Sequence, residues 1–179
     1  MYRFSAASRG ESIVFGAARP DYREPQVDKW INFMRTQDVQ RVCCLLSESQ
    51  LSRYNDLLNV YRDTSGTDQV CWAPTEDFQI VDPHLLTDRI LPFLAISKRK
   101  KERVVVHCAA GIGRTGQVLA AWLVAEHRLS NNAAIAAVRA MGRNPYEAVI
   151  AAPFKGRNPV QVASELDRLL DAAGQFRKP

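Results

Sequence analysis

The sequence lacks the residue clusters that bind structural metals. Its four cysteines stand at positions 43, 44, 71 and 108 without a Cys-x-x-Cys pair, and the whole chain has three histidines. Zinc sites need closely spaced cysteine and histidine ligands. We therefore expect no bound metal and no other cofactor.

Long apolar runs are also missing. The longest, at residues 118–125, is far shorter than the roughly 18 residues of a membrane-spanning helix. The N-terminal residues have no apolar core of the kind found in signal peptides. We expect a soluble, cytoplasmic protein without a membrane span, in which lone cysteines are packing residues or catalytic groups.

The charge of the chain is unevenly distributed. It has 24 basic and 19 acidic side chains among 179 residues, a net charge of +5. Residues 1–97 carry 10 basic and 13 acidic groups (net −3), and residues 98–179 carry 14 and 6 (net +8). The length fits one domain over 1–179. The charge favours an anionic partner such as a phosphorylated substrate, a nucleic acid or a membrane surface.

Strand-like and helix-like segments alternate along the chain. Strand patterns occur at 13–15, 39–46, 69–72 and 104–106, and helical spacing occurs at 26–36, 51–61, 85–94, 118–129, 130–141 and 159–172. This rhythm predicts an α/β fold with a mostly parallel central sheet and helices on both faces. The predicted core covers about 11–172, and we expect the tail at 174–179 to be frayed.

The strand at 104–106 leads directly into a loop suited to bind phosphate. A tight loop between a strand and a helix N-terminus directs backbone N–H groups into one concavity, and the helix dipole adds positive potential. The loop and the helix that follows supply the expected phosphate-binding residues, which are Ala109, Ala110, Gly111, Ile112, Gly113 and Arg114.

The side chains around this loop have expected catalytic roles. Cys108 begins the positive concavity, which favours its thiolate and makes it the candidate nucleophile. The planar guanidinium of Arg114 matches two phosphate oxygens, and Thr115 can donate its hydroxyl to the sulfur. His107 alternates with Cys108 along the strand and should point away from the substrate, so we assign it a supporting role in ordering the loop.

The segment HCAAGIGRTG resembles the signature of the cysteine-dependent protein tyrosine phosphatases, His-Cys-x-x-Gly-x-x-Arg-Ser/Thr-Gly, at all six specified positions. The order of elements is similar to that of the compact dual-specificity branch. The low-molecular-weight phosphatases carry a related motif, but close to the N-terminus. The resemblance implies a phosphatase fold and an enzyme that hydrolyses phosphotyrosine, and also phosphoserine and phosphothreonine, in proteins through a phosphocysteine intermediate. We expect the protein to be a monomer.

Such a phosphatase needs a carboxylic acid to protonate the leaving oxygen and later to deprotonate water. The loop after the strand at 69–72 should supply it, and Asp77 matches the family's acid loop best. Asp82 and Glu76 are the alternatives. The loop departs from its relatives because Pro83 follows Asp77 by six residues instead of a few.

The chain also departs from its relatives in the segment that follows the helices predicted at 118–129 and 130–141. Relatives place Gln or Asn after an Arg-Pro turn to position the hydrolytic water, whereas this chain has the sequence GRNPYE at 142–147. Asn144 and Gln161 are the candidates for that role. Arg143 either holds the phosphate side of the pocket or is an exposed arginine at a helix end.

Other functions remain as alternatives. The same chemistry could act on phosphoinositides, although lipid phosphatases of this superfamily carry lysines in the loop and residues 109–113 have none. RNA 5′-phosphate ends suit the basic second half, but the basic run at 98–103 fits a solvated helix end better. An inactive phosphopeptide-binding module is disfavoured because Cys108, Arg114 and Asp77 are all present. Cys44 and Cys71 are candidate redox partners of an oxidised Cys108.

Overall fold

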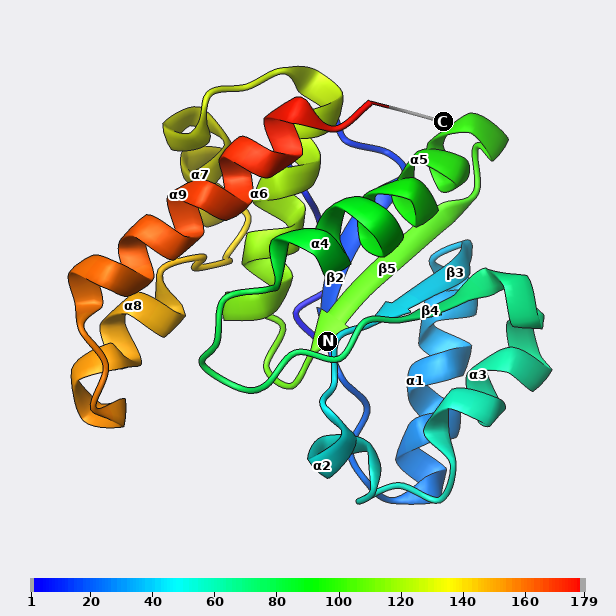
Figure 1. The fold of residues 1–179 in the computed structure, drawn as a ribbon. Helices are drawn as coiled ribbons and strands as arrows, with labels where there is room; N and C mark the ends of the chain where they lie inside the picture. The colour runs from blue at the N-terminus through cyan, green and yellow to red at the C-terminus, as the bar shows by residue number, and fades with distance from the viewer. Residues whose placement is uncertain (1, 178–179) are drawn as a thin grey trace.

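The computed structural model describes residues 2–177 and has a five-stranded sheet at its centre (Figure 1). The strands are β1 (Ser5–Ala6), β2 (Val14–Ala18), β3 (Val39–Cys44), β4 (Val70–Trp72) and β5 (Arg103–Cys108), in the order β1-β2-β5-β3-β4. β1 pairs antiparallel with β2, and the other three pairs are parallel. The predicted mostly parallel sheet is confirmed, and β5 lies in its middle.

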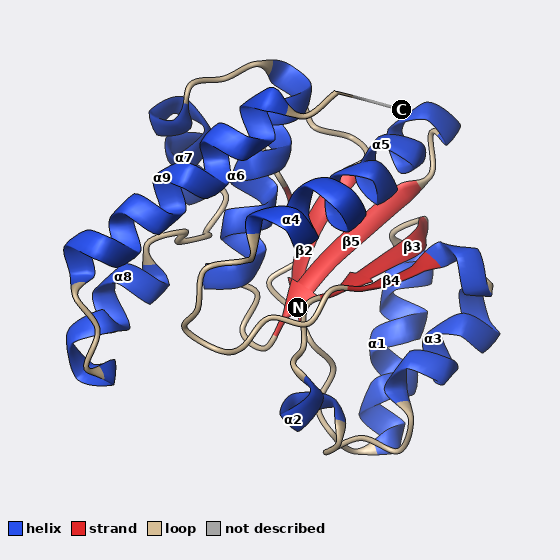
Figure 2. Ribbon diagram, in the orientation of Figure 1, coloured by secondary structure: helices blue, strands red, loops and turns tan. Residues whose placement is uncertain are grey.

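Helices cover both faces of this sheet (Figure 2). One face packs against α1 (Glu24–Thr36) and α3 (Leu57–Ser65), and the other packs against α5 (Leu91–Lys100), α6 (Gly113–His127), α7 (Asn131–Ala140) and α9 (Pro159–Gln175). Shorter elements are α2 (Glu48–Leu51), α4 (Pro83–Leu85), α8 (Glu147–Ala151), the 3-10 turns Thr67–Gln69 and Ala152–Lys155, and the π turn Leu86–Ile90 that joins α4 to α5.

The central strand β5 is buried on both faces. Val104, Val106 and Cys108 belong to the core cluster with α5 and α6, whereas Val105 belongs to the cluster with α1 and α3. Successive side chains of a strand point to opposite faces. His107 therefore lies on the α1 and α3 side, and the Cys108 side chain lies on the α6 side.

Helix α6 is buried along most of its length, as its apolar sequence predicts. Every residue from 113 to 125 is buried, including the polar Arg114 and Gln117 near its start. A helix surrounded on all sides is held rigidly by packing. Among the described residues, no helix is both long and apolar enough to cross a membrane.

The single helix predicted over 51–61 is wrong, because two helices occupy this region. α2 ends at Leu51 and α3 begins at Leu57, and the turn between them places Asp56 in the left-handed region at φ 58°. Tyr54 in this turn is buried, and its hydroxyl donates to the carbonyl of Pro20 at 2.7 Å. This contact with a distant segment, rather than helical propensity, decides the local conformation.

The expected frayed tail is also wrong for residues 174–176. α9 continues to Gln175, and Phe176 packs against the core cluster. Burial of this aromatic ring stabilises the last helical turn. Residues 178–179 of the predicted tail lie outside the described residues. The sequence pattern also does not predict β1 or α8, each of which is at most five residues long.

Candidate active site

The loop after β5 lies at the carboxyl edge of the parallel strands. Cys108 ends β5 and is 2% exposed, and α6 begins at Gly113. We call residues 109–112 between them the cradle loop. β2 leads to α1 on one face of the sheet, and its neighbour β5 leads to α6 on the opposite face, so the two connections diverge at this edge. Open α/β sheets bind ligands at such a position.

The cradle loop has fixed carbonyls and unpaired amides. The N–H of Arg19, just after β2, donates to the carbonyls of Cys108 at 3.0 Å and Ala109 at 3.2 Å. Within the described part of the chain, the N–H groups of residues 109–112 donate to no other protein group. Four neighbouring amides without partners form a receptor for an oxyanion.

Gly111 lets this loop lie directly against β2. Its φ is 70°, and a side-chain carbon at this position would overlap with the backbone of Ala17 and Ala18. Only glycine combines this left-handed conformation with so close an approach. The position of the cradle loop therefore depends on the absence of a side chain here.

The turn at 143–147 holds the cradle loop from behind. Arg143 donates through Nη1 to the carbonyl of Gly111 and through Nη2 to the carbonyl of Gly16 at 2.7 Å. The N–H of Asn144 donates to the carbonyl of Ile112 at 3.3 Å. Arg143 is 3% exposed, and burial lowers its pKa to about 10. Of the two roles considered for Arg143, an exposed helix-end position is wrong, because its side chain holds the loop.

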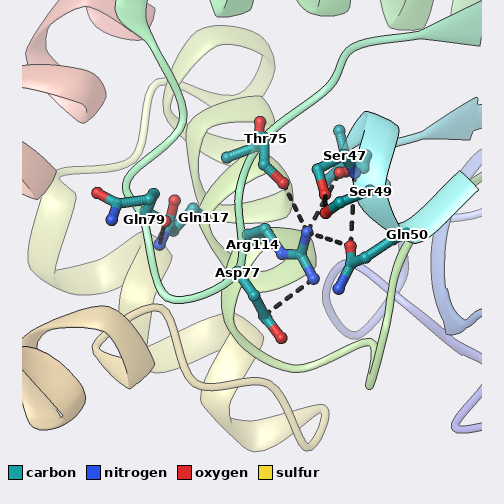
Figure 3. A network of polar contacts seen from close by, with 9 residues as sticks. Ser47, Ser49, Gln50, Thr75, Asp77, Gln79, Arg114 and Gln117 are labelled. Carbon is teal, nitrogen blue, oxygen red and sulfur yellow. Dashed lines mark hydrogen bonds and ion pairs between the residues drawn. The ribbon is translucent and has the colours of Figure 1, made fainter. Parts of the chain in front are cut away.

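Arg114 joins α6 to the loop that follows β4 (Figure 3). Its Nη2 forms an ion pair with Oδ1 of Asp77 at 2.9 Å. Its Nη1 donates to the carbonyl of Thr75 at 2.6 Å and to Oε1 of Gln50, in α2, at 2.9 Å. Arg114 is 2% exposed, whereas the Asp77 side chain is 44% exposed. One buried cation thus holds Asp77 at the site while leaving the carboxylate open to solvent.

Gln117 holds the other half of the same 73–82 loop. Its Oε1 accepts the N–H of Val81 at 3.0 Å, and its Nε2 donates to the carbonyl of Gln79 at 3.3 Å. Figure 3 shows Gln117 and Gln79 next to each other, on the other side of Thr75 and Asp77 from Gln50. Arg114 and Gln117 are three residues apart and lie on one face of α6. The helix therefore fixes the loop on both sides of Asp77.

The other carboxylates considered for the acid lie elsewhere. Asp82 caps α4 by accepting the N–H of Leu85 at 2.9 Å, and Glu76 is exposed. Among the three candidates, only Asp77 contacts Arg114 within the described residues. Gln161, a candidate for positioning water, is exposed on α9.

His107 lies on the opposite face of the sheet from Cys108. Its ring is fully buried, 5.3 Å from the Trp30 ring, and its Nε2 is 3.3 Å from the hydroxyl of Tyr61. Burial lowers the pKa of His107 to about 3. The imidazole is therefore neutral at physiological pH and packs beneath the strand end, which suits an ordering role.

Thr115 is buried in the first turn of α6. Its methyl group lies near Gly16, and its hydroxyl has no hydrogen-bond partner among the described residues. A buried hydroxyl without a partner is costly. A ligand or a reaction intermediate that accepts a hydrogen bond from this hydroxyl would remove the desolvation penalty.

Glu147 is a site residue that the sequence analysis did not identify. It begins α8, and its carboxylate lies against Gly113, where it fills the space that a side chain at this position would need. Burial raises the pKa of Glu147, and the nearby charge of Asp77 raises it further. The sequence indicates this role only weakly, through an acidic residue four positions after Arg143.

A model of the dual specificity phosphatase catalytic domain matches residues 28–148. This chain belongs to the dual-specificity phosphatase family. The matched segment contains Asp77, Cys108 and Arg114, and membership confirms the resemblance seen in the sequence and the prediction of a phosphatase. The tyrosine-protein phosphatase cdc-14 of Caenorhabditis elegans is 38% identical over 55 residues, which make up 30% of this chain and 8% of that relative. The match thus covers only a small part of that relative's length.

Solved phosphatase structures share the fold of this dual-specificity phosphatase. Tk-PTP in its active form has a TM-score of 0.63 and 24% identity, covering 87% of this chain and 92% of that one. PTPMT1 in complex with PI(5)P has a TM-score of 0.70 and 15% identity, covering 95% and 96%. At these identities the likeness concerns the fold.

Replacing Gly111 tests the geometry of the cradle loop. Gly111→Ala should weaken binding of vanadate, a phosphate mimic, by more than about tenfold, because overlap costing at least ~1.4 kcal/mol must push the loop away from β2. Gly142→Ala is the matched control, since Gly142 also has positive φ but open space around it. Both variants share the left-handed penalty of about 1–2 kcal/mol. Equal vanadate affinities of the two variants, measured by calorimetry, would contradict this account.

Glu147 should make stability depend on pH. Its raised pKa means that the folded state binds this proton more tightly than the unfolded state, so its carboxylate costs stability as pH rises from the ordinary carboxyl range through the folded pKa. Glu147→Gln should therefore increase the free energy of unfolding at neutral pH, and the gain should vanish in acid. Denaturant titrations across pH test this, with Glu76→Gln as the exposed control. A gain that is independent of pH would contradict it.

Proposed function

We propose that this chain hydrolyses phosphate monoesters in proteins, phosphotyrosine and also phosphoserine and phosphothreonine, through a phosphocysteine intermediate. One observation supports this most strongly. Cys108 lies beside four backbone N–H groups that have no protein partner, at the start of the helix from which Arg114 binds Asp77. A nucleophile, an oxyanion receptor, a cation and a proton donor are thereby gathered at one edge of the sheet.

In the first step the thiolate of Cys108 attacks phosphorus, a sulfur–phosphorus bond forms and the bond to the leaving oxygen breaks. The amides of the cradle loop and the guanidinium of Arg114 hold the other phosphate oxygens. Asp77 gives its proton to the leaving oxygen. Because Nη2 of Arg114 donates to Asp77 in this structure, a phosphate dianion that takes this donor also frees the carboxyl group to turn toward the leaving group.

In the second step water attacks phosphorus, the sulfur–phosphorus bond breaks and Asp77 takes the proton of the water. The unpartnered hydroxyl of Thr115 donates to the departing thiolate. Glu147 is the residue that orients the water, because its carboxylate lies over Gly113 at the start of α6. Gln161 is not suited to this role, since it is exposed on α9.

The surface next to the cradle loop favours a protein substrate. The guanidinium groups of Arg19 and Arg53 both stack on the ring of Tyr22, at 3.6 and 3.9 Å from its centre. Arg19 also contacts the cradle loop through its backbone. Cations fixed on an aromatic ring suit acidic residues flanking a phosphorylated side chain. No lysine lies in residues 109–113 to neutralise the additional phosphates of a polyphosphoinositide.

RNA ends are a weaker candidate because the basic run is far from the site. Residues 98–103 span the end of α5 and the first residue of β5. Cys108 is at the other end of that strand, about 17 Å away at the usual rise of a β-strand. This run therefore does not line the approach to the cradle loop.

Replacement of the nucleophile and the acid tests the chemistry. Cys108→Ser should abolish hydrolysis of a phosphotyrosine peptide. Asp77→Asn should lower kcat by about 10²–10⁴-fold, the usual contribution of general acid catalysis. Asp82→Asn is the matched control and should keep the wild-type rate, because asparagine also caps helices well. A wild-type rate and pH profile in Asp77→Asn would show that another group is the acid.

Substrate class is tested by comparing kcat/KM for four substrates of the wild-type chain: a phosphotyrosine peptide, a phosphoserine peptide, PI(5)P in vesicles and 5′-triphosphorylated RNA. PI(5)P is included because PTPMT1 was solved with it. We expect the phosphotyrosine peptide to be best, and acidic flanking residues to improve it about two- to fivefold over neutral ones, since exposed ion pairs contribute up to ~1 kcal/mol. Faster turnover of PI(5)P or RNA would identify that substrate class instead.

A further inference from the structure

The cysteines other than Cys108 differ in their surroundings. All of them are free and buried. Cys44 packs among the side chains that face α1 and α3, where burial raises its pKa to about 12. Cys43 and Cys71 both lie in the cluster on the opposite face of the sheet. Cys44 is therefore an inert packing residue, and the other two thiols share one environment.

Cys43 and Cys71 are direct neighbours across two strands. They are register partners in the parallel pair β3 and β4, and both side chains belong to the core cluster on the same face of the sheet. Neighbouring strands lie about 4.7–4.9 Å apart. Disulfides join residues whose Cα atoms are roughly 4.4–6.8 Å apart. The backbone already holds this pair within bonding range.

Cys108 has no such partner. Cys43 is in register with Val106, two residues before Cys108. Two residues along a strand and one strand across amount to about 8 Å, which exceeds the ~7 Å limit for a disulfide without backbone movement. Cys71 is one strand farther away, and Cys44 faces the other side of the sheet. The redox partnerships with Cys108 considered from the sequence are therefore out of reach in this structure.

The two thiols differ in reactivity. Cys71 lies on the edge strand β4 and is 6% exposed. The neighbouring Cys43 thiol lowers the pKa of Cys71, and the positive charge of Arg89 lowers it further. Cys43 is fully buried, and its pKa is raised. Cys71 is thus the nucleophile of the pair, and Cys43 is the thiol that resolves it.

We propose that Cys43 and Cys71 form a peroxide-reactive site, separate from the Cys108 site, that closes to a disulfide across β3 and β4. The Cys71 thiolate attacks hydrogen peroxide, the O–O bond breaks, and a sulfenic acid and hydroxide form; hydroxide takes a proton and becomes water. The sulfur of Cys43 then attacks the sulfenic sulfur, the S–S bond forms, and the S–O bond breaks to release a second water. Two thiols are oxidised by two electrons while the peroxide is reduced to two waters.

This disulfide would lie at the base of the 73–82 loop. That loop begins directly after β4, and the N–H of Ala73 donates to the carbonyl of Cys44 at 2.9 Å. A disulfide between β3 and β4 would hold in place the end of β4, from which the loop that contains Asp77 extends. It also lowers the conformational entropy of the unfolded chain between residues 43 and 71, which raises thermal stability.

The test uses the full chain with Cys108→Ser, so that its outcome is independent of phosphatase activity. After hydrogen peroxide treatment and trypsin digestion without reductant, peptides 42–53 and 63–89 should be linked, and dithiothreitol should separate them. Cys44→Ser is the matched control and should keep the link, whereas Cys43→Ser and Cys71→Ser should lose it. The oxidised chain should have a higher Tm than the reduced chain.

Arg89→Gln provides a second measurement that does not depend on removing a core thiol. Arg89 is exposed, so this variant should fold normally and form the disulfide several-fold more slowly. The substitution removes the trypsin site at position 89, so the linked peptides in this variant are 42–53 and 63–98. Absence of the link in the Cys108→Ser chain, a link through Cys44, or oxidation of Cys71 that stops at the sulfinic acid would overturn the proposal. An unchanged rate in Arg89→Gln would overturn the role of Cys71 as the attacking thiol.

Discussion

The buried guanidinium of Arg114 is the constraint on which the site depends. Taking a cation out of water costs several kcal/mol, and only close anionic and carbonyl partners offset this. The partners come from three segments: Asp77 and Thr75 from the 73–82 loop, Gln50 from α2 and Leu45 from the end of β3. Because α6 is packed on every side, the helix stays in place and the loops adapt to it. The location of Asp77 thus follows from the need to neutralise Arg114.

The same constraint links substrate binding to proton transfer. In the proposed reaction a phosphate dianion and the Asp77 carboxylate compete for the same nitrogen of Arg114. Whichever anion binds it, the guanidinium remains paired, so the exchange avoids leaving a buried charge uncompensated. Gln117 holds the far half of the 73–82 loop through Gln79 and Val81 throughout. The carboxyl group can therefore turn while the loop that carries it stays anchored.

Sequence patterns predict the strand, the loop and the helix at this site because the contacts that determine them are local. The strand, cradle loop and helix from 104 to 116 are contiguous, so one motif defines Cys108, Arg114 and the amides between them. Contacts between distant segments have no such pattern. Arg143 reaches Gly111 and Gly16 across the fold, and Glu147 reaches Gly113 only because the turn at 143–147 folds under the cradle loop. The break near Tyr54 has the same origin, since a residue 34 positions away fixes it.

Net charge was a useful but incomplete guide to the site. The second half of the chain carries the excess of basic groups. Its longest run of basic residues, at 98–103, lies at the start of β5, whereas Cys108 lies at the end of this strand. A distance of about 17 Å along the strand is twice the ~8 Å screening length at physiological salt. Arg143 is buried beneath the loop, where its guanidinium donates hydrogen bonds to the carbonyls of Gly111 and Gly16. In the proposed reaction, the attraction for phosphate therefore comes from the four amides of the cradle loop and the guanidinium of Arg114, and their orientation matters more than the sum of charges.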